Sequence, residues 1–77
     1  MAIGFILINA APGHEHEVFN KLSQIQDIVE IHSLFGEFDI IVKIEANDFE
    51  ELGEIVVNKI RSIDGVIDTK TLTGTKF

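Results

Sequence analysis

The sequence predicts an α+β domain in which four antiparallel strands form one sheet and two helices cover one of its faces. Two observations support this prediction. The hydrophobic pattern alternates between short extended runs and helical stripes, in the order strand, helix, strand, strand, helix, strand. The second half also repeats the first at an offset of 38 residues, since residues 18–25 and 56–63 share four identities in eight positions. We therefore expect two similar strand–helix–strand units.

The first half begins with a buried strand. Residues 3–9 form an apolar run too short for a helix, and Ala10-Ala11-Pro12-Gly13 ends it with the residues typical of a turn. From His14 the spacing becomes helical. The apolar stripe of this helix is Val18, Leu22 and Ile25.

The middle of the chain predicts a hairpin. Residues 28–35 are rich in β-branched side chains, and residues 38–45 alternate between apolar and mixed positions. Only Gly36-Glu37 separates them. A two-residue connection that starts with glycine is typical of a type II′ turn, so these strands should be antiparallel neighbours.

The second half repeats this order. Either Asn47 or Asp48 can cap a second helix, because each has a glutamate three residues later. Asp64-Gly65 ends this helix, and residues 66–73 form a last, threonine-rich strand. The apolar stripe of the helix is Phe49, Leu52, Val56, Ile60 and Ile63. With right-handed crossovers, the two units interleave as a ferredoxin-like βαββαβ sheet.

One face of this sheet has no helix to cover it, although the first strand is apolar on both sides. The two sets are Ile3, Phe5 and Leu7, and Ile6 and Ile8. A domain of 77 residues buries only about 60% of the surface of its unfolded chain. In this sequence 45% of the residues are hydrophobic, and there is no cysteine to form a stabilising disulfide. We expect a second copy to cover the open face, with Ile6, Ile8 and Ile41 at the dimer interface.

Charge excludes several partners. Thirteen acidic and six basic residues give a net charge of −7, and no cluster of lysine or arginine is present to bind nucleic acid or an anionic membrane. The longest apolar stretch is far too short to span a bilayer, and the N-terminus has no secretion signal. We expect a cytoplasmic protein that contacts neither nucleic acid nor membrane directly.

The titratable residues predict no catalytic centre, metal or cofactor. His14 and His16 point about 200° apart on a helix, so they do not share a face. His32 has no partner identifiable from the sequence. The carboxylates of Glu50, Glu51 and Glu54 are interpreted as a solvated helix face.

The hairpin residues allow two interpretations. Gly36 permits close approach of a backbone, and Asp39 could accept hydrogen bonds from an ammonium group. Alternatively, Gly36 only serves the turn and Asp39 caps it. The residues alone leave both interpretations open.

Residues 35–44, Phe-Gly-Glu-Phe-Asp-Ile-Ile-Val-Lys-Ile, are followed by the Asn47-Asp48-Phe49 helix start and later by Ile63-Asp64-Gly65-Val66. This pattern resembles the effector-binding half of the leucine-responsive and asparagine-sensing (Lrp/AsnC) transcriptional regulators, the regulation-of-amino-acid-metabolism domain. The similarity runs over essentially the whole chain, residues 1–77. It resembles the stand-alone version, a single domain without the DNA-binding half.

The resemblance implies a ferredoxin-like domain that dimerises through its sheets and builds rings, commonly of four dimers, with small amino-acid effectors bound where dimers meet. Gly36, Phe38 and Asp39 match the family's pocket, and Thr69 and Thr71 match it more loosely. Asp39 would hold the ammonium group of the effector. The implied function is effector binding and oligomerisation rather than catalysis, with full-length Lrp/AsnC regulators as potential partners.

Two other classes are compatible with the same topology. Asn9-Ala10-Ala11-Pro12-Gly13 is similar to the turn after the first strand of ACT domains, which also sense amino acids. Small dimeric ferredoxin-like monooxygenases share the sheet, but they usually need Trp, Tyr, Asn or His in the cleft, and this sequence has neither Trp nor Tyr.

Overall fold

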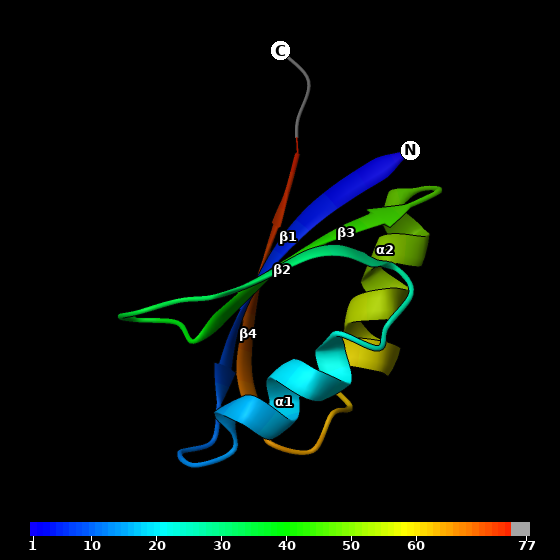
Figure 1. Ribbon diagram of the computed structural model, residues 1–77. Helices are drawn as coiled ribbons and strands as arrows, with labels where there is room; N and C mark the ends of the chain where they lie inside the picture. The colour runs from blue at the N-terminus through cyan, green and yellow to red at the C-terminus, as the bar shows by residue number, and fades with distance from the viewer. Residues whose placement is uncertain (75–77) are drawn as a thin grey trace.

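The computed structural model describes residues 1–74 and has one antiparallel sheet with both helices on one face (Figure 1). The strand order is β2-β3-β1-β4, so β2 and β4 are the edge strands. This confirms the predicted ferredoxin-like fold. The elements are β1 (Ala2–Ala10), α1 (Glu15–Leu22), β2 (Ile28–Ser33), β3 (Ile40–Ala46), α2 (Phe49–Ile55), the π turn η1 (Val56–Ile60) that continues α2, and β4 (Val66–Thr73).

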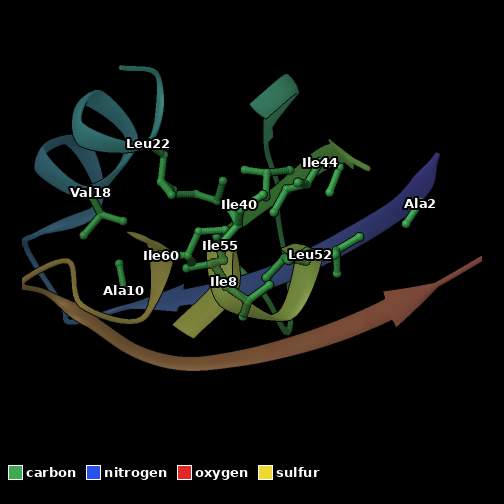
Figure 2. Packing of buried hydrophobic residues seen from close by; sticks show 14 residues of the cluster. Ala2, Ile8, Ala10, Val18, Leu22, Ile40, Ile44, Leu52, Ile55 and Ile60 are labelled. Atoms are coloured by element: carbon green, nitrogen blue, oxygen red, sulfur yellow. The ribbon is translucent and has the colours of Figure 1, made fainter. Parts of the chain in front are cut away.

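The hydrophobic core lies between the helices and one face of the sheet, where the labelled side chains point toward one another (Figure 2). On β3 the alternation is regular: Ile40, Val42 and Ile44 are buried, while the residues between them are partly exposed. The helices contribute the buried residues of the predicted stripes, namely Val18, Leu22, Leu52, Val56 and Ile60.

The internal repeat corresponds to equivalent positions in the core. Val18 and Val56 are both buried, as are Leu22 and Ile60, and each pair is separated by the repeat offset. The next matched pair, residues 25 and 63, is partly buried against the same core. Matched positions in the two halves of the chain therefore pack into the same hydrophobic core.

The prediction that Ile6 and Ile8 lie on the open face of the sheet is wrong, because both are fully buried beneath the helices. Strand alternation places Gly4 on their side, and a Cβ atom at Gly4 would lie 2.8 Å from Leu52 Cδ1 of α2. A face that includes a glycine under a helix must be the inner face. Ile41 does lie on the open face.

The predicted two-residue turn at Gly36-Glu37 is also wrong. The Asp39 N–H donates to the Ile8 carbonyl at 3.0 Å, while the Asp39 carbonyl accepts from the Leu34 N–H at 2.8 Å. In a regular strand the N–H and C=O of one residue face the same neighbour, whereas those of Asp39 face opposite neighbours. The ladder is interrupted there, so β3 begins one residue later and residues 34–39 form the connection.

The start of α2 decides between the two predicted caps. Asp48 has an extended backbone, and its side chain accepts a hydrogen bond from the Glu51 N–H at 2.8 Å. The Glu51 carboxylate reaches back to Asn47, accepting from its side-chain amide at 3.1 Å and from its backbone N–H at 3.4 Å. Asp48 is therefore the N-cap, and Glu51 bonds to the residue before the cap rather than to the cap itself.

The two ends of the described chain lie side by side. Gly4 of β1 pairs with Thr73 of β4, and the Gly74 N–H donates to the Ile3 carbonyl at 3.2 Å. The hairpin connection, residues 34–39, lies at the opposite end of β1, because Ile8 pairs with Ile40.

Candidate functional site

Asp39 forms hydrogen bonds to the end of β1 and to the start of the hairpin connection. Its Oδ2 atom accepts a hydrogen bond from the Ala10 N–H at 2.9 Å, in addition to the backbone bonds to Ile8 and Leu34. The side chain is partly buried. Within residues 1–74, no donor bonds its second oxygen, Oδ1. The Asp39 side chain therefore bonds to the end of β1 and does not cap the hairpin turn, and one carboxylate oxygen is left for another donor.

A cavity of about 400 Å³ opens between α1 and the ends of β2 and β3. We call it the α1 cavity. Asp39 lines it together with Phe19, which offers an apolar wall, and His16, which offers an imidazole. The complete lining is Glu15, His16, Phe19, Asn20, Ser33, Leu34, Asp39 and Ile40.

The other predicted hairpin residues do not reach this cavity. Gly36 adopts φ 115°, a backbone conformation that favours glycine, and a Cβ atom there would meet nothing within 4 Å. Gly36 therefore serves the loop. Phe38 is partly buried and does not line either of the two larger cavities, whereas Phe35 at the loop tip is fully exposed.

The predicted threonines line a second cavity, of about 360 Å³, which we call the β4 cavity. Thr69 and Thr71 pair with Ile8 and Ile6, so their side chains lie on the helix side of edge strand β4. The full lining is Val56, Arg61, Val66, Ile67, Asp68, Thr69 and Thr71.

The predicted effector residues thus divide between two cavities. Asp39 precedes β3, Thr69 lies on β4, and β1 runs between them. Two strand spacings separate these positions by roughly 10 Å. Within one chain they do not converge on a single small ligand.

Sequence reasoning missed two sets of lining residues. One is Arg61 in the β4 cavity, and the other is the α1 set of Glu15, His16, Phe19 and Asn20. The order of the elements is the signal they leave, since Arg61 follows the second helix close to the start of β4, and the first half of α1 lies beside the end of β2. No motif marks these residues.

The open face of the sheet has an apolar centre. Ile3, Phe5 and Leu7 of β1 alternate with the buried residues, and Leu7 has Ile41 and Lys70 as its cross-strand neighbours. Toward β2 the face becomes charged. Lys43 Nζ and His32 Nε2 each lie 3.5 Å from a carboxylate oxygen of Glu30.

The described residues contain no cluster of three or more His, Asp or Glu side chains placed to hold a metal ion. His14 instead lies beside Glu17, with 3.7 Å between Nδ1 and Oε2, and both side chains are half exposed. No helix in residues 1–74 has the length and apolar character required to cross a membrane.

Comparison with known proteins decides the family. Residues 3–75 match the Lrp/AsnC ligand binding domain. The chain belongs to this family. An uncharacterized HTH-type transcriptional regulator of Pyrococcus horikoshii is 38% identical to this Lrp/AsnC domain over 71 residues, which cover 88% of the chain and 47% of that regulator. The chain therefore spans about half the length of the curated relatives it matches.

Two further similarities are informative. The crystal structure of FFRP-DM1 superposes with a TM-score of 0.92 and 33% identity, and the match covers 97% of this Lrp/AsnC domain and all of that chain. A homocitrate synthase of Sulfurisphaera tokodaii is 43% identical over 54 residues, which are 70% of this chain but only 12% of the enzyme. Segments similar to this domain thus occur in a regulator and in a much longer enzyme chain.

Proposed function

We propose that this Lrp/AsnC domain binds a small amino-acid effector, associates with itself as a dimer and a ring of dimers, and acts on transcription or amino-acid metabolism through protein partners. The observation that carries the proposal is the carboxylate of Asp39. One of its oxygens is fixed by the Ala10 N–H at 2.9 Å, and the side chain lines the α1 cavity. A carboxylate held in this way needs little reorganisation to accept an ammonium group.

The open face supports self-association. Phe5 and Leu72, which are cross-strand neighbours there, are 40% and 46% exposed in one chain. Covering such side chains stabilises an assembly through the hydrophobic effect, and a second copy of the same sheet offers a matching surface. Ile41, predicted for the interface, lies within this patch.

A binding role rather than catalysis fits the neighbours of the domain. The relatives that match most of the chain are transcriptional regulators, and the enzyme match covers only 12% of that enzyme. The same module attached to two different kinds of protein is what an effector sensor would give. The net charge of −7 argues that an effect on DNA passes through a partner, such as a full-length Lrp/AsnC regulator.

The test is a thermal-shift screen of the protein against each of the twenty L-amino acids, coupled to measurement of assembly mass. A ligand that binds only the folded protein adds about 2.7 kcal/mol of stability at a hundredfold excess over Kd. Asp39→Asn keeps an oxygen for the Ala10 N–H but removes the charge, so we expect it to fold and to lose this response. The matched control is Glu37→Gln, which removes a charge from the same loop outside the cavity.

A screen in which none of the twenty amino acids raises the melting temperature would refute effector binding. A response of Asp39→Asn equal to that of the unmodified protein would remove Asp39 from the site. The family match favours this proposal over the ACT-like and monooxygenase alternatives.

A further inference from the structure

Glu30 on the open face of the sheet is shared between two basic side chains. Its Oε1 atom lies 3.5 Å from His32 Nε2, and its Oε2 atom lies 3.5 Å from Lys43 Nζ. Glu30 and Lys43 are cross-strand neighbours on β2 and β3, and His32 follows two residues later on β2, so all three side chains project from one face. We call these three residues the open-face triad.

A second triad of the same composition lies on the helix side. The Glu17 carboxylate lies 3.7 Å from His14 Nδ1 and 3.5 Å from Lys21 Nζ. His14 directly precedes α1 and the other two residues are on α1, which covers the opposite face of the sheet (Figure 1). The chain thus carries one triad on the open face and a matched one away from it.

The open-face triad borders the apolar centre of that face. Phe5 and Ile41 line a small hollow of about 40 Å³ together with the three members of the triad. Both apolar side chains are exposed in part in a single chain. A second copy that covers Phe5 and Ile41 therefore removes water from the triad as well.

We propose that protonation of His32 opposes self-association through the open face, so that the assembly comes apart as the pH falls. This inference rests on the proposed function, because it concerns the regulation of the same surface. Histidine is the side chain whose charge ordinarily changes between about pH 5 and 8. With His32 neutral, the charges of Glu30 and Lys43 cancel, whereas with His32 protonated the triad carries one uncompensated positive charge.

The sign follows from the removal of water. Covering an uncompensated charge costs free energy, so the covered face favours the neutral form of His32. Assembly therefore releases protons, and by linkage a higher proton concentration weakens the assembly.

The remaining charges of the open face are too far from His32 to change this balance. Within residues 1–74, strand pairing places Glu45, Asp68 and Lys70 on the same face. His32 pairs with Ile41, and Glu45 is four residues further along β3, roughly 13 Å away. Asp68 and Lys70 are on β4, three strand spacings or roughly 14 Å from β2. Charges in solvent are largely screened beyond about 8 Å at physiological ionic strength.

A second copy brings the same groups in balanced numbers. With a two-fold axis parallel to the strands, the β4 of one copy lies over the β2 of the other, and β4 offers one carboxylate and one amine, Asp68 and Lys70. With the axis perpendicular to the strands, β2 lies over β2, and the two triads face each other. Neither arrangement supplies His32 with a carboxylate that lacks a matching amine on its own strand pair.

The test is analytical ultracentrifugation at about pH 7.5 and about pH 5.5, at one ionic strength and over a range of protein concentrations. The Kd of the open-face dimer should be about tenfold or more higher at the lower pH, since each dimer contains two copies of His32. Aspartate and glutamate side chains ordinarily stay ionised over this range. Circular dichroism at both pH values checks that the chain stays folded.

Two histidine variants locate the effect. His32→Gln keeps a donor for Glu30 but takes up no charge, so its self-association should be the same at both pH values. His14→Gln is the matched control, because His14 also lies beside a glutamate that is shared with a lysine, but on the helix side. This variant should keep the full pH dependence.

Lys43→Gln tests the cause. Without the lysine, Glu30 has only the histidine of the triad to neutralise it, so protonation of His32 should now strengthen self-association. The pH dependence of this variant should therefore be opposite to that of the unmodified protein.

The outcomes separate this inference from the proposed function. Equal assembly at both pH values, or a pH dependence that persists in His32→Gln, would overturn the proton switch and leave the open-face interface intact. Stronger assembly of the unmodified protein at the lower pH would also overturn it, because a carboxylate of the second copy would then be neutralising His32. A protein that is monomeric at every pH would overturn the proposed self-association together with this inference.

Discussion

Gly4 packs so closely against Leu52 that a Cβ atom at position 4 would lie 2.8 Å from the Leu52 Cδ1 atom. This contact lets α2 approach the centre of the sheet, because Gly4 lies on the inner face of β1 between Ala2 and Ile6. The contact also identifies which side of β1 faces the helices. Ile6 and Ile8 share the parity of Gly4 and are buried, while Ile3, Phe5 and Leu7 form the open face.

Replacing this glycine should destabilise the protein. Leu52 is 2% exposed, so its side chain has little room to move away from the new methyl group in Gly4→Ala. Overpacking of this kind costs about 1–3 kcal/mol. Urea denaturation at fixed protein concentration should show the loss.

Gly53→Ala is the matched control, because Gly53 lies within α2 and a Cβ atom there would meet nothing within 4 Å. Alanine is the better helix former, so this variant should gain about 0.5–1 kcal/mol. A Gly4→Ala protein as stable as the unmodified one would show that Leu52 does not confine position 4.

Asp39 should contribute to folding independently of any effector. Ala10 is buried, and Asp39→Ala removes the acceptor of its N–H. An unpaired buried donor costs about 1–3 kcal/mol. Asp39→Asn retains an acceptor oxygen and should lose much less. Thermal and urea unfolding of both variants without amino acids tests this, and equal losses would mean that the charge, not the hydrogen bond, matters.

Asp48 should be the more important of the two residues that precede α2. Asp48→Ala removes the acceptor of the Glu51 N–H and should destabilise the protein by about 1 kcal/mol, whereas Asp48→Ser should recover most of this. Asn47→Ala removes only exposed contacts and should cost a few tenths of a kcal/mol by comparison. Chemical denaturation ranks the three variants, and the opposite ranking would place the cap at Asn47.

The open face should control assembly. Leu7→Glu places a charge at the apolar centre of this face, where Lys70 is its cross-strand neighbour and can pair with it in a single chain. We expect a folded protein of lower mass in analytical ultracentrifugation. Val57→Glu is the control, since Val57 is 55% exposed on the helix side. Unchanged sedimentation of Leu7→Glu would exclude the open face as the interface.

The fold was predictable because its signals are local and repeated. Helical stripes such as Val18 and Leu22, and the alternation on β3, follow directly from burial of one face. It was harder to predict which side chains of β1 face the helices, since both alternating sets are apolar. Ala2, Gly4 and Ala10 are the small residues that mark the inner face, and weighing size together with hydrophobicity would have identified it.

The sites were less predictable because they depend on distances between segments. The hairpin connection differs from the expected turn because the backbone of Asp39 bonds to Ile8 of β1 on one side and to Leu34 on the other, which no local pattern specifies. The π turn before Arg61 likewise has no signal in the pattern, because its buried residues Val56 and Ile60 fit an ordinary helix equally well in the sequence.

The hydrogen bond between Gly74 and Ile3 has a consequence for how the chain can be joined to other domains. Because the two ends of the described residues lie together at one end of the sheet, a domain joined before residue 1 or after residue 74 would leave from the same corner, away from the 34–39 connection. A short linker between the ends would also close the chain into a ring. Cutting that ring at the exposed Phe35 would give a circular permutant with the same core.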